Sequence, residues 1–340
     1  MTKSSLVRQP LTILSISNSE IQTFKDCRRR WWLTYYRELG FRRELEDPTG
    51  VRNLGARIHA ALQAMYERGV NPIEAIDEIY YDDIQKLIEV GMDDKITKLQ
   101  EEQDLAHAML EGYLEWAAEN AIDAEYDVVS VEEIVEVDSG IPGVKMRGML
   151  DQRIQRRSDG ARLFRDWKTT GSFGELEAML PLDEQARFYH LLEQLDARYR
   201  AKVNTELGDG QDHDGRSLMW RTDGALYLML RRVKRTAAAR PPFYKQVEVR
   251  HNSKIIATTW QRVHKVLQEI VDTRDELDRG GDHQYHCPPR PSRDCTWKCD
   301  FLAACPLFDD GSNVEGLIER HYEHRDPHER YYRDQQKEKS

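Results

Sequence analysis

The 340-residue sequence has no long apolar run. Its first 17 residues contain only a short apolar stretch, far below the hydrophobic region of a signal peptide. No later segment approaches the roughly 20 apolar residues that a membrane helix needs. Hydrophobic residues make up 39% and charged residues 32% of the chain, a composition typical of strongly solvated globular proteins. We therefore expect a cytoplasmic protein without a membrane partner.

Cysteine is scarce, and its five residues cannot all pair with one another. In a reducing compartment, cysteine more often serves metal binding or chemistry than disulfides. Three of the five are clustered in the segment Cys295-Thr-Trp-Lys-Cys299-Asp-Phe-Leu-Ala-Ala-Cys305, whereas Cys27 lies far away in the sequence. This spacing favours a metal site over a disulfide framework.

Positive charge is in deficit overall, because the formal net charge is -10. That balance argues against a protein that is cationic all over, but phosphates respond to local patches within a Debye length. Segment 25–43 has seven Lys/Arg against two acidic residues and is interleaved with aromatics, and segment 216–250 has nine against two. Stacking aromatics beside arginines would suit a single strand. The alternatives are a solvated face and, for some aromatics, core packing. The candidate nucleic-acid contacts are Arg28, Arg29, Arg30, Trp31, Tyr35, Arg231, Arg232, Lys234 and Arg235.

Hydrophobic periodicity predicts one α+β domain over residues 1–315, with a mixed sheet flanked by helices. A capping box at Ser17-Asn-Ser-Glu20 opens the first helix, and two acidic helices within 72–119 form a helical insertion. Period-two alternation from Tyr126 onward predicts three consecutive antiparallel strands. Residues 316–340 are expected to be a polar tail that frays. The other expected elements are helices over 181–201 and 253–277, strands around 217–233 and 243–250, and a Cys-rich segment over 287–306.

The turn Ser158-Asp-Gly160 joins the second and third of these strands, and an Asp-Gly pair favours a two-residue hairpin loop. That loop would place Asp151 opposite Lys168 and diagonal to Asp166. Two carboxylates and an ammonium group converging at strand ends are costly unless something binds there. One interpretation is a simple cross-strand salt bridge. The other is a divalent metal, Mg²⁺ or Mn²⁺, held by the carboxylates for phosphodiester hydrolysis.

Four short motifs favour the second interpretation. They are Gly55-Ala-Arg-Ile-His59, Gly148-Met-Leu-Asp151, Asp166-Trp-Lys168 and Gln185-Ala-Arg-Phe-Tyr189. In order and approximate spacing they resemble the GxxxH, GxxD, DxK and QxxxY elements of RecB-type nucleases in the PD-(D/E)XK superfamily. The resemblance extends from about Ser17 to Pro306. It implies a restriction-endonuclease-like fold and metal-dependent cleavage of nucleic acid.

The same resemblance implies roles for individual residues. Lys168 would activate the attacking water, while Gln185 and Tyr189, four apart on one helix face, would position Lys168 or the DNA strand. Without the resemblance, these two would be read as part of an ordinary amphipathic helix, and His59 as a core histidine. An imidazole among the ligands also makes Mn²⁺ a good alternative to Mg²⁺. The implied metal ligands are His59, Asp151, Asp166 and the backbone carbonyl of Trp167.

The cysteines resemble the iron–sulfur ligands of AddB-type nucleases and of the CRISPR-associated RecB-like exonucleases. That resemblance implies a 4Fe–4S cluster that joins both chain ends into an Fe–S-linked rim, with Cys287 left over. A competing interpretation is a local Zn²⁺ site made by Cys287 and the three C-terminal cysteines, with Cys27 as a small buried hydrophobe. A third is that no metal binds. The cluster ligands would be Cys27, Cys295, Cys299 and Cys305.

Taken together, these features predict a metal-dependent DNA exonuclease acting at DNA ends, chiefly on single strands, in recombination, repair or replication. A helicase or recombination protein is the expected partner. The alternative is a non-catalytic DNA-end-binding subunit of a helicase–nuclease or recombination complex. The presence of Asp151, Asp166 and Lys168 argues against that alternative, because DNA binding alone does not require this arrangement of charges.

Overall fold

The computed structural model describes residues 13–43, 46–207 and 222–331, and within them the chain builds a six-stranded mixed sheet. The strand order is β1-β4-β5-β6-β7, with β3 paired to the other side of β4. The β1–β4 and β5–β6 pairs are parallel and the others are antiparallel, so the predicted α+β class with a mixed sheet is confirmed. The strands are β1 (Leu14–Ser17), β3 (Tyr126–Asp138), β4 (Val144–Arg156), β5 (Arg162–Thr170), β6 (Gly224–Arg231) and β7 (Tyr244–Arg250).

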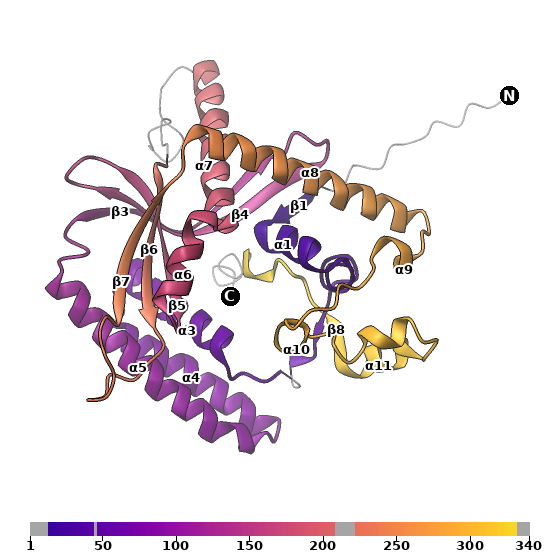
Figure 1. Ribbon diagram of the computed structural model, residues 1–340, viewed down its shortest axis with the longest axis horizontal. Coiled ribbons are helices and arrows are strands. Elements are labelled where there is room, and N and C mark those ends of the chain that lie inside the picture. The colour runs from indigo at the N-terminus through magenta and orange to yellow at the C-terminus, as the bar shows by residue number, and fades with distance from the viewer. Residues whose placement is uncertain (1–12, 44–45, 208–221, 332–340) are drawn as a thin grey trace.

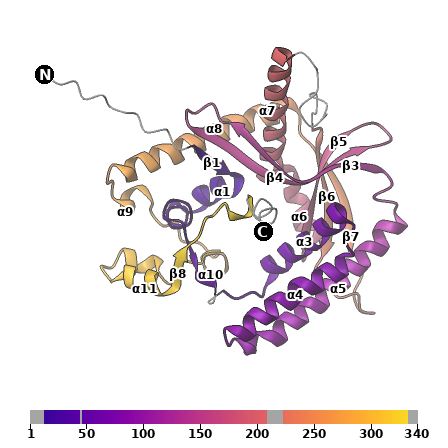
Figure 2. The ribbon, with the colours of Figure 1, turned by 180° about the vertical axis from the view of Figure 1, so that it is seen from behind.

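Helices cover both faces of this sheet (Figures 1 and 2). The main helices are α1 (Asn18–Asp26), α3 (Val51–Arg68), α4 (Pro72–Glu89), α5 (Ile96–Glu119), α7 (Glu184–Leu207) and α8 (Ser253–Asp278). Shorter ones are α2 (Arg28–Trp31), η1 (Trp32–Tyr36), η3 (Asp93–Lys95), α6 (Phe173–Met179), η4 (Leu180–Leu182), α9 (His283–His286), α10 (Cys295–Lys298), η5 (Cys305–Phe308), α11 (Val314–His321) and η6 (Glu329–Tyr331). Within the described part of the chain, none of the helices combines the length and apolarity needed to span a bilayer.

The central strand β6 shows how the two faces are used. Its side chains alternate between faces, and Tyr227 and Met229 lie in one hydrophobic core while Leu228 and Leu230 lie in a second. The first core is formed with α1, α7 and α8, and the second with α3, α4 and α5. A strand buried on both faces reads as a continuous apolar run, which is why GALYLMLR shows no alternation.

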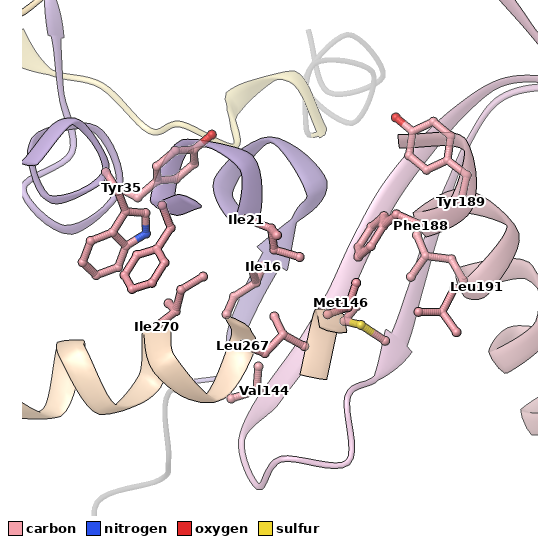
Figure 3. Close-up of a cluster of buried hydrophobic side chains, with 14 of the residues drawn as sticks. Ile16, Ile21, Tyr35, Val144, Met146, Phe188, Tyr189, Leu191, Leu267 and Ile270 are labelled. Carbon is pink, nitrogen blue, oxygen red and sulfur yellow. The ribbon is translucent and has the colours of Figure 1, made fainter. Parts of the chain in front are cut away.

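The first core joins elements that are far apart in the sequence. Figure 3 shows Ile16 of β1, Ile21 of α1, Met146 of β4, and Leu267 and Ile270 of α8 as neighbours in one cluster. Each is at most 3% exposed. Since burying one such side chain stabilises the fold by about 1.5–3 kcal/mol, this cluster fixes α1 and α8 against the sheet.

Helix starts follow the expected capping chemistry. The Ser17 hydroxyl accepts a hydrogen bond from Glu20 N at 3.2 Å and begins α1, as the capping box predicts. Asn71 and Asn252 cap α4 and α8 in the same way. Two helices, α4 and α5, occupy the segment predicted to be a helical insertion.

The predicted register of the β4–β5 hairpin is wrong by two residues. Gln152 pairs with Arg165, so Asp151 falls opposite Asp166 rather than opposite Lys168. The loop holds four residues instead of two, because Arg156 N bonds to the Ala161 carbonyl. Asp159 accepts hydrogen bonds from the Arg156 side chain and from Ala161 N, which stabilises the longer loop.

The predicted polar tail is also wrong for residues 316–331, while residues 332–340 lie outside the described part. Strand β8 (Tyr322–His324) pairs antiparallel with β2 (Leu39–Phe41). The Tyr322 ring is 3% exposed and stacks on Phe41 and Phe301. The composition of this segment did not predict its structure. The sequence is mostly polar, but a few apolar residues and pairing with a strand near the N-terminus hold it in place.

Candidate active site

Three elements, α3, β4 and β5, bring the predicted metal ligands together. The β4–β5 pairing ends at the pair of Gln152 and Arg165. Asp151 on β4 and Asp166 on β5 are the adjoining residues, so they lie opposite each other. His59 on α3 lies with Nδ1 3.2 Å from Oδ2 of Asp151 on β4. The His59 Nε2 atom contacts the backbone carbonyl oxygen of Trp167 on β5. Lys168 Nζ lies 2.8 Å from Oδ2 of Asp166, so the DxK pair joins the same group.

Two motif glycines allow this approach. A Cβ atom on Gly55 would lie 3.1 Å from Thr169 Oγ1, which shows how closely α3 packs on β5. A Cβ atom on Gly148 would lie 2.6 Å from Leu192 Cδ1 and would also press on the Tyr189 ring. The glycines of the GxxxH and GxxD motifs are therefore needed for helix-to-strand contact on both sides of the site.

Helix α7 supplies the remaining predicted residues. Lys168 Nζ donates to Gln185 Oε1 at 2.8 Å, and Gln185 Nε2 donates to the Tyr189 hydroxyl at 3.1 Å. Because Gln185 and Tyr189 are four residues apart, they lie one above the other on the helix. The structure thus brings both together with Lys168, as the QxxxY motif predicts.

The carboxylates are buried and influence each other. Burial raises the pKa of Asp166, and the nearby charge of Asp151 adds to the rise, against the opposing charge of Lys168. Burial also acts to raise the pKa of Asp151, but its hydrogen bond and charge interaction with His59 keep that pKa below its usual value. Desolvation disfavours the imidazolium form of His59, yet the two aspartates outweigh it and raise the His59 pKa. The positive charges of His59 and Lys168 therefore offset the two buried carboxylates.

Among the described residues, no three or more His, Cys, Asp or Glu side chains already stand in an arrangement that holds a metal ion. Here the side chains contact one another instead. The donor chemistry nevertheless fits one, because two buried carboxylates lie side by side, with Asp151 Oδ2 next to His59 and Asp166 Oδ2 next to Lys168. Two carboxylates, a carbonyl and an imidazole suit Mg²⁺ or Mn²⁺. These four groups are the ones that could hold such an ion.

Sequence reasoning missed two residues beside this group. Asp183 precedes α7, and its Oδ2 accepts a hydrogen bond of 2.9 Å from the hydroxyl of Tyr227 on β6. Burial alone would lower the pKa of Lys168, but the charges of Asp166 and then Asp183 raise it. An Asp just before a helix is a typical N-cap, so the sequence could have indicated a capping role for Asp183. Nothing in the sequence could have indicated Tyr227, because its place beside Asp166 depends on the β5–β6 register.

Part of the predicted nucleic-acid surface is buried. Trp31 is fully buried and Tyr35 is 8% exposed, so the prediction that they stack on bases is wrong. Both belong to the first core, where Trp31 meets Phe24 edge to face. Arg29 is 1% exposed and forms a bidentate ion pair with Asp309, so it is not a phosphate contact either. The core-packing alternative holds for this part of segment 25–43.

The other predicted phosphate contacts remain accessible. Lys234 forms an ion pair with Asp104 at 3.2 Å, and Arg235 forms one with Glu115 at 2.7 Å. Both are surface ion pairs, which are weak. Two aromatics that the prediction did not include are exposed, Tyr285 by 87% and Trp297 by 64%. The half-exposed or exposed residues from the predicted set are Arg28, Arg30, Arg231, Arg232, Lys234 and Arg235.

The cysteines are all free thiols, and Cys27 lies against the Cys-rich segment. Arg290 N donates to Cys27 Sγ at 3.4 Å. Burial raises the pKa of both Cys299 and Cys305, and the nearby Cys27 thiol adds to both increases. Cys287 is fully buried in the first core, and burial raises its pKa to about 12. It is therefore Cys287, not Cys27, that behaves as a small hydrophobe.

Comparison with known proteins identifies a family for this chain. A model described as the PD-(D/E)XK nuclease superfamily matches residues 15–306. No curated protein matches the chain. Among solved structures, the one titled "Crystal structure of SSO0001" has 13% sequence identity and a TM-score of 0.26, and the match covers 74% of this chain and 83% of that one. The superfamily match spans most of the sequence and includes all four motifs, and so the chain belongs to the PD-(D/E)XK nuclease superfamily.

Proposed function

We propose that this protein is a metal-dependent DNA exonuclease that hydrolyses phosphodiester bonds at DNA ends. Superfamily membership supports a nuclease. The observation that carries the proposal is the meeting of His59, Asp151, Asp166 and Lys168, in which two buried carboxylates lie side by side and are balanced by an imidazole and an ammonium group. Burying two carboxylates together is costly, and a bound divalent cation would offset that cost.

The chemistry of each side chain indicates its role in the proposed reaction. His59, Asp151, Asp166 and the Trp167 carbonyl would hold Mg²⁺ or Mn²⁺, which when bound lowers the pKa of a water and neutralises phosphate charge. The Lys168 ammonium cannot ligate a cation, so its place is beside the attacking water or the developing negative charge. Gln185 accepts a hydrogen bond from Lys168 and so limits where that ammonium points.

The substrate proposal rests on the surface and on the motifs. Arg231, Arg232, Lys234 and Arg235 follow the end of β6, the strand beside β5, and a phosphate backbone competes well for cations held only in surface pairs. The end-directed mode and the choice of single-stranded DNA are proposed from the resemblance to RecB-type nucleases. A helicase or recombination protein that exposes such ends is the proposed partner.

We also propose that Cys27, Cys295, Cys299 and Cys305 bind a 4Fe–4S cluster. Support comes from the contact of Cys27 with the segment before Cys295. Cys27 also lies close enough to Cys287, Cys299 and Cys305 to raise the pKa of each. A cluster takes four thiolates, and these are the four cysteines that are not fully buried. The zinc alternative requires Cys287, which is fully buried in the first core.

The test compares wild-type protein with Asp166→Ala on end-labelled linear DNA and on covalently closed circular DNA, single- and double-stranded. We expect wild-type protein to degrade linear single strands with Mg²⁺ or Mn²⁺ and to leave circles intact. Asp166→Ala should abolish cleavage but keep DNA binding in Ca²⁺, because the surface cations remain.

Asp82→Ala is the control, since it removes an exposed aspartate from α4, which carries none of the candidate site residues. It should cleave like wild-type protein. Wild-type rates in Asp166→Ala would refute the active site, and cleavage of circles would refute the exonuclease mode. Binding without any wild-type cleavage would instead support a non-catalytic DNA-end-binding subunit.

A further inference from the structure

The start of α7 is tied to the sheet beside the candidate active site. Asp183 immediately precedes the helix, and its Oδ1 accepts a hydrogen bond of 2.9 Å from Gln185 N. The Asp183 carbonyl also accepts from Arg187 N at 3.2 Å, as expected of an N-cap residue. The other carboxylate oxygen, Oδ2, accepts from the Tyr227 hydroxyl at 2.9 Å. One carboxylate therefore caps α7 and bonds it to β6.

This hydrogen bond between Asp183 and Tyr227, the tether, has a neighbour of the Lys168 ammonium beside each of its two residues. Tyr227 is fully buried on β6 and is the register partner of Asp166 on β5. Gln185, whose backbone amide bonds to Asp183, uses its side chain to accept a hydrogen bond of 2.8 Å from Lys168. Gln185, one of the two groups that hold the Lys168 ammonium, is thus placed through Asp183, while the other, Asp166, is the register partner of Tyr227.

We propose that Asp183, held by Tyr227, is a positioning residue that fixes the first turn of α7 so that Gln185 directs the Lys168 ammonium. The inference rests on the proposed nuclease function. Asp183 does not touch the reacting atoms, and it acts through Gln185. Without the cap and the tether, the first turn of α7 would fray, and Gln185 Oε1 would leave the position that sets the direction of Lys168.

The experiment separates positioning from general stability by comparing three variants. Asp183→Ala removes both hydrogen bonds, Asp183→Asn keeps an oxygen for the cap, and Asn71→Ala removes a similar cap from α4, far from the site in the chain. Initial rates are measured at steady state over a range of concentrations of end-labelled single-stranded DNA with saturating Mn²⁺. We expect Asp183→Ala to lower kcat at least tenfold with KM changed less than twofold. Asp183→Asn and Asn71→Ala should stay within threefold of wild-type protein.

A second measurement does not depend on catalysis. Hydrogen exchange of the metal-free protein should show faster exchange for the amides of residues 184–190 in Asp183→Ala and in Tyr227→Phe, but not in Asn71→Ala. An unchanged kcat in Asp183→Ala, an equal loss in Asn71→Ala, or unchanged exchange in residues 184–190 would overturn the proposal. If wild-type protein cleaves no DNA, the proposed function fails, whereas the exchange result still decides whether the tether exists.

Discussion

At the scale of single residues, Lys168 is the group whose role can be separated most clearly from metal binding. Its Nζ lies 2.8 Å from both Asp166 Oδ2 and Gln185 Oε1. Lys168→Ala should slow single-turnover cleavage by roughly a hundredfold to a thousandfold, because it removes positive charge from the transition state. Mn²⁺ affinity, followed by calorimetric titration, should change less than threefold. Loss of Mn²⁺ binding in parallel with the rate would contradict this role, and Lys145→Ala is the surface control.

A second residue-scale prediction concerns His190, which is 1% exposed on α7. Burial lowers its pKa to about 4, with a smaller contribution from His251. The folded protein therefore keeps this imidazole neutral, while the unfolded chain binds a proton below pH 6.5. Stability should fall as the pH drops from about 6.5 towards 4, by about 2 kcal/mol between pH 7 and pH 5 from this group alone.

The check is chemical denaturation of wild-type protein and His190→Gln at pH 7 and pH 5. The variant should lose less stability between the two pH values, even if it starts lower at pH 7. His321→Gln removes an exposed histidine and serves as the control. An equal pH dependence in wild-type protein and His190→Gln would show that His190 does not contribute.

At the scale of elements, the sequence predicted which segments form helices and strands better than it predicted how they pair. The motifs identified His59, Asp151 and Lys168 around Asp166, because their chemistry is local and their order is fixed, but they did not identify Tyr227. The register of Asp151 was wrong because loop length depended on the side chain of Asp159, which bonds to Arg156 and to Ala161 N. Trp31 was wrongly assigned to the DNA-binding surface, because an aromatic residue next to arginines gives the same sequence pattern whether it lies in a core or on such a surface.

The β2–β8 pair was not predicted, and it leads to a test. Tyr322 of β8 packs between Phe41 and Phe301 and donates a hydrogen bond of 2.7 Å to the Asp300 carbonyl. Tyr322→Ala should lower the free energy of unfolding by about 3 kcal/mol, as for other large aromatics removed from a core. His324→Ala, on the exposed end of the same strand, should have little effect in the same denaturation experiment. Equal losses would show that Tyr322 is not an anchor.

At the scale of the whole molecule, the cysteines offer a test of how the two chain ends are joined. Cys27→Ala should remove the visible absorbance and the iron of an anaerobically prepared protein, because it deletes the remote ligand of the proposed cluster. Cys287→Ala should keep both, since that thiol lies in the core. A colourless wild-type protein with about one zinc per chain, lost in Cys287→Ala but not in Cys27→Ala, would refute the cluster.

The joining of the two chain ends also has a consequence for synthesis on the ribosome. Leu39 pairs with His324, Arg29 bonds with Asp309, and Arg290 N bonds with Cys27, so the N-terminal segment completes its contacts only when the last part of the chain exists. At roughly 5–20 residues per second, the N-terminal segment waits about 15–55 seconds for these partners. During that interval Trp31 and Tyr35 lack part of their core, and exposed apolar surface of this kind is prone to aggregation.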